Sequence, residues 1–303
     1  METEAGHQFT TKLGLVCITH GEEIRYRTIT RSRFLGLGPI QAEEALRSIY
    51  KDNLQKFLQA IDYCRANRIH LYRLLCGLFP MVDYPAGAKV YAELSEHFPI
   101  IGKIARKQGL RIIMHPDQYV VLNSERPAVV KQSIGIMQEH ARLFDSFGLP
   151  QTPWAAFILH GGKSGRAEQL CETIAGLPPN IRKRLVLEND EHAYSAAEIL
   201  EICKQSEIPM VFDPHHHVIK EKLSSYRDAS VAYFLEAAAE TWPKREWQIA
   251  HISNGATHFL DQKHSDLITD FPEALFSVPY VEIEAKHKEH ALSALRLRYP
   301  QLG

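Results

Sequence analysis

The chain has 303 residues and a formal net charge of −1, and 45% of its residues are hydrophobic and 23% charged. This composition is typical of a globular protein with a large core and excludes a disordered chain. No stretch approaches the roughly 18 apolar residues of a membrane span, and the polar residues 1–11 lack the features of a signal peptide. We therefore expect no membrane partner, and a flexible N-terminal segment at 1–11.

The apolar runs along the chain predict strands, and the amphipathic segments between them predict helices. The predicted strands are 13–18, 70–75, 111–115, 155–160, 185–188, 209–213, 247–252 and 279–284. The predicted helices are 43–66, 91–108, 127–147, 167–175, 196–206, 230–241, 272–276 and 287–298. Such alternation predicts one α/β domain, a (β/α)8 TIM barrel spanning 1–303, with a doubly wound open sheet as the alternative.

The chain contains five cysteines, an odd number without any C-x-x-C spacing. This pattern is typical of reduced thiols in a cytosolic protein, and it disfavours a zinc–thiolate site. We therefore predict a cytoplasmic protein. The near-neutral charge gives no sign of a large basic surface for nucleic acid.

Residues that can bind a metal ion stand at the ends of the last six predicted strands. They are His115, His160, Glu188, Asp213, His251 and Glu284. Because side chains alternate along a strand, each of the first five has an apolar residue two positions earlier on the same face. These apolar residues are Ile113, Ile158, Val186, Val211 and Ile249. The pattern predicts an apolar inner layer, capped by polar residues at the mouth where such barrels keep their active sites.

Each of these polar residues alone has an ordinary structural interpretation, as a hydrogen-bonded loop histidine or a buried ion pair. Six of them in register at one mouth would be costly to bury without a compensating charge. Divalent cations supply that charge, and an imidazole and carboxylate set suits Zn²⁺, Mn²⁺ or Fe²⁺. We expect two or three ions, with the two oxygens of Glu188 able to bridge a pair. Closely spaced ions suit phosphodiester hydrolysis.

A series of motifs then identifies a family. In chain order they are Asn53, Tyr72-Arg73, Phe79-Pro80, residues 114–119, His160-Gly161-Gly162, residues 187–190, Asp213 with His216-His217, His251, residues 263–266 and Glu284-Ala285-Lys286. In order and spacing this set resembles the UV damage endonuclease family, and more distantly endonuclease IV. The resemblance runs from about residue 13 to 289. It implies a DNA excision repair nuclease with a trinuclear metal site, acting on damaged double-stranded DNA without an obligate protein partner.

The resemblance also implies roles for single residues. Glu188 would bridge the ions and, with His251 and Glu284, form the catalytic group. His115 and His160 would join Glu188 at one ion, and Asp213, His251 and Glu284 at a second; His216 and His264 would hold a third. Mn²⁺ or Zn²⁺ is the expected metal. Asn189 and Asp190 are candidates to orient these ligands.

The expected DNA contacts lie in the loops of the mouth. Gln118 and Tyr119 match the pair that such enzymes insert at a lesion, where stacking is worth roughly 1–3 kcal/mol per base. Without the resemblance, the same pair is an ordinary surface turn. Lys163, Lys263 and Lys286 are expected phosphate contacts, and each alone is an ordinary surface charge. The implied activity is incision immediately 5′ of a UV photoproduct or an abasic site.

Four positions depart from the family pattern. Leu15 replaces an aromatic residue, an apolar segment ending at Gly77 replaces a more polar one, and Ile249 stands where some relatives carry lysine. Glu282 places an acid one layer below Glu284, where an apolar residue is expected. We predict that Glu282 pairs with an inward basic group, for which Arg73 is the candidate.

Three other functions compete with this interpretation. An aldose–ketose isomerase of the xylose isomerase type also uses a metal-binding barrel, although its site usually has more carboxylates and fewer imidazoles. An abasic-site endonuclease without activity on UV lesions would fit the departures at Leu15 and Gly77. A non-catalytic lesion-binding protein is disfavoured because no ligand of the ring is missing.

Overall fold

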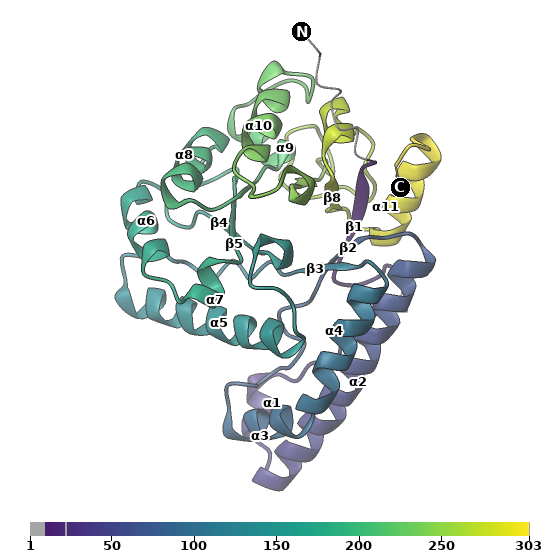
Figure 1. Cartoon of the computed structure of the whole chain (residues 1–303), viewed down its shortest axis with the longest axis vertical. Helices are drawn as coiled ribbons and strands as arrows, with labels where there is room; N and C mark the ends of the chain where they lie inside the picture. The colour runs from purple at the N-terminus through teal and green to yellow at the C-terminus, as the bar shows by residue number, and fades with distance from the viewer. Residues whose placement is uncertain (1–9, 22, 303) are drawn as a thin grey trace.

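The computed structural model describes residues 10–21 and 23–302. Eight strands surround a common centre, and the helices lie outside them (Figure 1). The strands are β1 (Lys12–Val16), β2 (Leu71–Arg73), β3 (Arg111–Ile113), β4 (Phe157–His160), β5 (Leu185–Glu188), β6 (Met210–Val211), β7 (Ile249–Ile252) and β8 (Tyr280–Ile283).

All strand pairings are parallel, and they follow the order of a barrel. Five strands pair as β3-β2-β1-β8-β7 and three as β4-β5-β6. Single parallel bridges, Met114 with Phe157 and Phe212 with Ala250, join the two sheets at their seams. The predicted (β/α)8 barrel is therefore confirmed, with the ladder thinned to one bridge at each of two seams.

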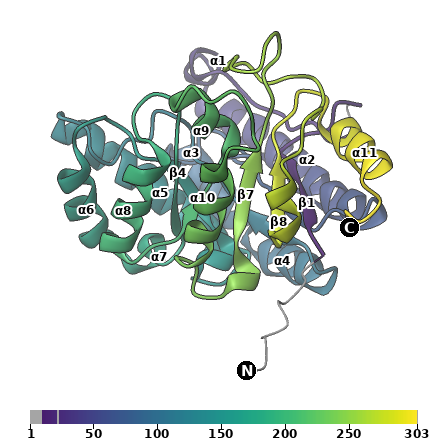
Figure 2. The ribbon, with the colours of Figure 1, turned by 90° about the horizontal axis from the view of Figure 1, so that it is seen from above.

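The α-helices cover the outside of the strands. They are α1 (Arg31–Leu35), α2 (Pro39–Ala66), α3 (Pro85–Glu93), α4 (Phe98–Lys107), α5 (Pro127–Ser146), α6 (Ala167–Ala175), α7 (Pro179–Arg182), α8 (Ala196–Ser206), α9 (Pro214–Lys220), α10 (Ala229–Ala239) and α11 (Lys288–Arg298). Figure 2 shows the barrel from the side. The chain enters β1 from below, and the loops that follow the strands gather above, on the side of α1. We call these two ends the floor and the mouth.

Several predicted helices needed correction. The segment 91–108 is not one helix, because α3 ends at Glu93, a 3-10 turn covers Ser95–His97, and α4 starts afresh at Phe98. Pro99 lies in the first turn of α4, where its missing N–H breaks no helical bond. The segment 272–276 is a 3-10 helix at Glu273–Ser277 rather than an α-helix. The short helices α1, α7 and α9 were not predicted.

The barrel interior is the apolar layer that strand alternation predicts. Its buried cluster contains Ile113, Ile158, Val186, Val211 and Ile249, together with Leu71, Ala156, Trp242 and Tyr280. A larger cluster fills the space between the strands and the helices. The interior is thus a packed core, and the polar strand ends form a lid above it.

The remaining global expectations concern the N-terminus, the cysteines and membranes. Most of the predicted flexible segment 1–11 lies outside the described residues, but Thr11 is buried and its hydroxyl donates to the Phe276 carbonyl (2.9 Å). All five cysteines are free thiols: Cys17, Cys64, Cys76, Cys171 and Cys203. Within the part of the chain that the structure describes, no helix is long and apolar enough to cross a bilayer.

Candidate metal centre

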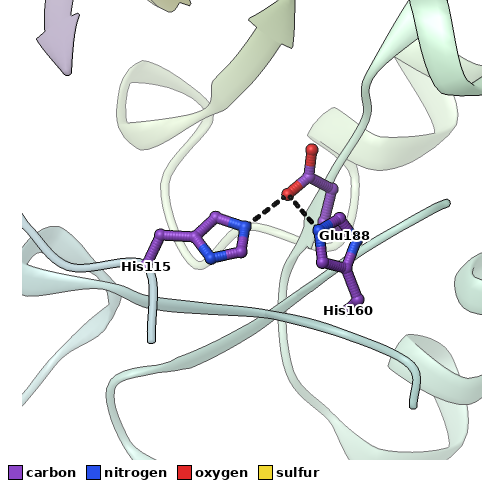
Figure 3. Close-up of side chains that lie close together, drawn as sticks. All are labelled: His115, His160 and Glu188. Carbon is purple, nitrogen blue, oxygen red and sulfur yellow. Dashed lines mark hydrogen bonds and ion pairs between the residues drawn. The ribbon is translucent and has the colours of Figure 1, made fainter. Parts of the chain in front are cut away.

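Glu188, the last residue of β5, lies at the centre of the polar ring and is buried. One carboxylate oxygen is 3.0 Å from His115 Nε2 and 4.0 Å from His160 Nε2 (Figure 3). The other is 2.8 Å from His251 Nδ1 and 3.7 Å from His216 Nδ1. One carboxylate therefore faces four imidazoles.

The environment of His115 calls for a proton or a metal ion between it and Glu188. Its Nδ1 is 3.1 Å from the Pro116 carbonyl, an acceptor, so this nitrogen carries the proton. In neutral imidazole, Nε2 then has a lone pair that points at a carboxylate oxygen 3.0 Å away. Two acceptors at this distance repel each other unless a proton or a metal ion lies between them.

His251 has a carboxylate oxygen close to each of its two ring nitrogens. Its Nε2 is 3.0 Å from a Glu282 oxygen, while its Nδ1 faces Glu188 and lies 3.6 Å from Glu284. If Glu282 accepts the Nε2 proton, Nδ1 is left as the ligand atom. A carboxylate that fixes a histidine in this way is a common partner of metal ligands.

One carboxylate oxygen of Asp213 is free to bind a metal ion. It caps the N-terminus of α9, and its Oδ1 accepts from the backbone N–H groups of His215 (2.6 Å) and His216 (3.1 Å). Its Oδ2 is buried without a hydrogen-bond partner, and so is Nδ1 of His160. Buried polar atoms are rarely left unpaired, so Oδ2 of Asp213 fits a centre that is completed by cations.

The pKa shifts of Glu188, His216 and His251 also indicate that the carboxylates of this site are balanced by positive charge. Burial alone would raise the pKa of Glu188, but His251, His160 and His115 outweigh it and hold that pKa well below its usual range. Burial would lower the pKa of His216, yet Asp213, Glu188 and Glu191 raise it to about 9. The pKa of His251 is also raised well above its usual value, against burial, by Glu188 and Glu282. Protons on these rings stand where metal cations would otherwise balance the carboxylates.

Arg73 on β2 neutralises Glu282 on β8 and Glu284, which directly follows the strand. Its guanidinium contacts Glu282, and one of its nitrogens is 2.5 Å from Glu284 Oε1. The predicted pairing of Glu282 with Arg73 is therefore confirmed. Burial would raise the pKa of Glu284, but Arg73 and then His251 lower it far below its usual range.

Three groups of side chains have ligand atoms that all lie within 4.8 Å of one another. They are His115, His160 and Glu188; Glu188, Asp213 and His216; and His251, Glu282 and Glu284. The first matches an expected ion site. In the second group, His216 lies with Asp213, and in the third, Glu282 lies with His251. The family resemblance implied neither pairing. His264 faces Glu284, with its Nε2 3.8 Å from Glu284 Oε2.

The expected DNA-contacting residues surround this ring. Gln118 and Tyr119 are exposed on the loop after β3, where they line a hollow of about 460 Å³ with His115 and His160. Lys163 and Lys263 are exposed, and Lys286 is exposed with its ammonium 3.9 Å from Asp266. The lesion-probe candidates and two ligand candidates thus share one cavity.

Sequence reasoning anticipated some supporting residues and missed others. Asn189 was a candidate to orient ligands, and its side chain bonds the backbone N–H (2.9 Å) and carbonyl (3.0 Å) of Asp213. Glu191 was missed, although it follows Glu188 by three residues and lies 3.7 Å from His216 Nε2. Asn123 and Tyr194, which connect the loops of the mouth, were also missed because no motif marks them.

The comparisons with known proteins agree on one family. The UV-endonuclease UvdE family model matches residues 11–302. A protein named UV DNA damage endonuclease from Nostoc sp. strain PCC 7120 is 48% identical over 287 residues, 94% of this chain and 89% of that protein. One of the same name from Deinococcus radiodurans is 47% identical over 292 residues, 95% of this chain and 96% of that protein. The crystal structure of SacUVDE has a TM-score of 0.83 at 26% identity and covers 96% of this chain and 100% of its own. The chain therefore belongs to the UV-endonuclease UvdE family.

Proposed function

We propose that this chain is a metal-dependent DNA repair endonuclease that cuts the phosphodiester immediately 5′ of UV photoproducts and of abasic sites. The observation that carries the proposal is the arrangement around Glu188. Imidazole nitrogens and carboxylate oxygens face each other across gaps that need metal ions or protons, at the mouth of a barrel whose family is that of UV endonucleases.

Each ion would have its own set of ligand candidates. His115, His160 and Glu188 would hold one, and Asp213, His216, His251, His264 and Glu284 would hold the others around the same bridging carboxylate. Two or three ions, Mn²⁺ or Zn²⁺, would supply a hydroxide near neutral pH and stabilise charge on the leaving oxygen. The donor set of imidazoles and carboxylates, without thiolate, suits these metals.

The remaining residues of the site hold the ligand candidates in place and orient them. Glu282 lies 3.0 Å from His251 Nε2 and would keep His251 Nδ1 directed at the centre. Arg73 keeps Glu282 and Glu284 ionised, because its charge favours the carboxylate forms. Glu188, His251 and Glu284 would form the catalytic group, since His251 Nδ1 lies 2.8 Å from Glu188 and 3.6 Å from Glu284.

The substrate is damaged duplex DNA. Tyr119 and Gln118 stand at the rim of the hollow that His115 and His160 also line. Side chains that fill the gap left by displaced nucleotides would therefore place the adjoining phosphodiester near the ligands. Lys163, Lys263 and Lys286 would contact the phosphates on either side.

Incision of end-labelled duplexes with one defined lesion each tests this function. The arms carry a cyclobutane pyrimidine dimer, a 6-4 photoproduct, an abasic site or no lesion, each with Mn²⁺, Zn²⁺ or EDTA. We expect one cut immediately 5′ of each lesion that depends on added metal. Cutting that survives complete metal removal would overturn the metal-based chemistry. Cutting of only the abasic duplex would replace the proposal with an abasic-site endonuclease.

A further inference from the structure

Three loops of the mouth meet at one buried amide, that of Asn123. Asn123 lies on the loop after β3, five residues past Gln118, and is completely buried. The loop after β4 passes beside it and carries Lys163 and Arg166. The loop after β5 reaches it through the hydroxyl of Tyr194. These are the loops that follow His115, His160 and Glu188.

The amide of Asn123 fixes the backbone of Lys163 on both sides. Its Oδ1 accepts from the Lys163 N–H (2.8 Å), and its Nδ2 donates to the Lys163 carbonyl (3.0 Å). The Tyr194 hydroxyl donates to the same carbonyl (2.6 Å) and accepts from the Arg166 N–H (3.1 Å). The side chain of Arg166 completes the contact, with its Nε donating to the Asn123 carbonyl (2.7 Å).

The close contact with Asn123 and Tyr194 requires glycine at two positions of the loop after β4. A Cβ on Gly162 would lie 2.3 Å from Asn123 Oδ1, and Gly162 has a φ of +85°, in the left-handed region. A Cβ on Gly161 would lie 2.4 Å from the Tyr194 ring. The backbone of this loop is therefore packed closely against the side chains of Asn123 and Tyr194.

The hydrogen bonds to Asn123 set where the positively charged side chains of Lys163 and Arg166 lie relative to the expected lesion probe, Gln118 and Tyr119. Lys163 is exposed, and Arg166 lines a surface hollow of about 390 Å³ together with Lys131. Gln118 and Tyr119 stand on the same loop as Asn123, and the next residue, Val120, is buried and anchors that turn. Any movement of the β4 loop away from Asn123 would change the distance between the phosphate contacts and the probe.

We propose that Asn123, with Tyr194, is a positioning residue for damage recognition, which holds Lys163 and Arg166 in register with Gln118 and Tyr119. Two cations at a fixed offset from the probe can hold the DNA backbone only when the probe occupies its gap, so damaged duplex binds better than intact duplex. This inference rests on the proposed endonuclease function. It assigns no role to Asn123 in metal binding or in the chemical step.

The test compares steady-state incision by Asn123→Asp, Tyr194→Phe and the wild-type protein, all loaded with metal. Asn123→Asp keeps the shape but removes the amide donors, and Tyr194→Phe removes the shared hydroxyl without adding charge. We expect KM for a lesion duplex to rise at least about tenfold in both, with kcat within about threefold and bound metal unchanged. The slope of log KM against log salt should fall by about 0.9 or more, which corresponds to the loss of one phosphate contact or more.

Asn67→Asp is the matched control, because it makes the same chemical change at an exposed residue that caps the C-terminus of α2, at the floor end. It should leave KM, kcat and the salt slope unchanged. Lys163→Ala is the reference for one lost phosphate contact and should reproduce part of the change in slope.

The outcomes separate the inference from the function on which it rests. Wild-type protein that cuts no lesion duplex would defeat the proposed function. Normal wild-type cutting with unchanged KM and salt slope in both variants would defeat only the role of Asn123. A fall in kcat together with loss of bound metal would also overturn the inference, because Asn123 would then support the metal ligands. If Asn123→Asp does not fold, Tyr194→Phe alone decides.

Discussion

The two ends of the barrel both bury charge, but they satisfy it in opposite ways. At the floor, the fully buried Arg111 donates to the carbonyls of Pro153, Trp154 and Trp247 at 2.7–2.9 Å. Its guanidinium also lies over the rings of Trp154 (4.6 Å) and Tyr280 (4.9 Å). At the mouth, Asp213 Oδ2 has no partner, and His115 Nε2 faces a Glu188 oxygen at 3.0 Å.

The difference separates a structural charge from a functional one. The protein itself meets the hydrogen-bonding needs of Arg111, so the floor requires nothing from outside. Glu188 and its neighbours are complete only when cations or extra protons join them. One apolar layer, which includes Ile113 and Val186, keeps the two ends apart.

Glu188→Gln should have the largest effect, because it removes the charge that every ion at the mouth shares. We expect incision to fall by at least about 10²–10³-fold, as when one preorganised electrostatic group is lost. Thermal unfolding should remain cooperative, because the amide has the same shape. Near-normal incision by this variant would show that Glu188 does not bridge the ions.

Arg111→Met tests the floor. It leaves three carbonyls without their donor, and the free energy of unfolding should fall by about 3 kcal/mol. Denaturant unfolding measures the loss. The kcat of the folded fraction should stay within about twofold of the wild-type value. A large fall in kcat at unchanged stability would mean that the two ends are not independent.

The metal-free protein should lose stability as pH rises, in a way that the metal-loaded protein does not. His216 has a folded-state pKa of about 9, above its ordinary value. Its contribution is therefore full below about pH 6.5 and is lost as pH rises through 9, at a cost of roughly 3 kcal/mol. Urea unfolding between pH 6 and 10, with and without Mn²⁺, measures this. Equal pH dependence in both forms would contradict the exchange of protons for ions.

Glu282→Gln should have a smaller effect, confined to the orientation of His251. We expect metal affinity to fall by about 10–100-fold, as is typical when the partner of a metal-binding histidine is changed. Competition with a fluorescent chelator measures the affinity, and saturating metal should restore most of the incision rate. Unchanged affinity would mean that Arg73 is the sole functional partner of Glu282.

Regular periodicity made the barrel and the ring predictable. Val186 and Glu188 alternate on β5 as a strand requires, and the same spacing repeats on neighbouring strands, so the mouth could be assembled from the sequence. His216 was harder to place, because it lies on α9, a helix of seven residues that begins immediately after its capping residue Asp213. Short helices give too few residues for a periodic pattern.

Contacts between loops could not be predicted. Asn123 bonds to residues about 40 and 71 positions away, and no local spacing encodes such pairs. The break between α3 and α4 was missed for a related reason, since residues on both sides of it pack on the same core and keep an apparently helical pattern. The prediction that Glu282 pairs with Arg73 succeeded because both residues lie on strands, where inward direction can be read.

Anomalous diffraction from crystals grown with Mn²⁺ tests the central claim most directly. The account predicts at least two Mn²⁺ peaks at the mouth, each beside Glu188, and none at the floor beside Arg111. In Glu188→Gln crystals the peak heights should fall sharply, while the surrounding side chains stay in place. No Mn²⁺ at the mouth, at a concentration that supports incision, would contradict the claim that this ring is a metal centre.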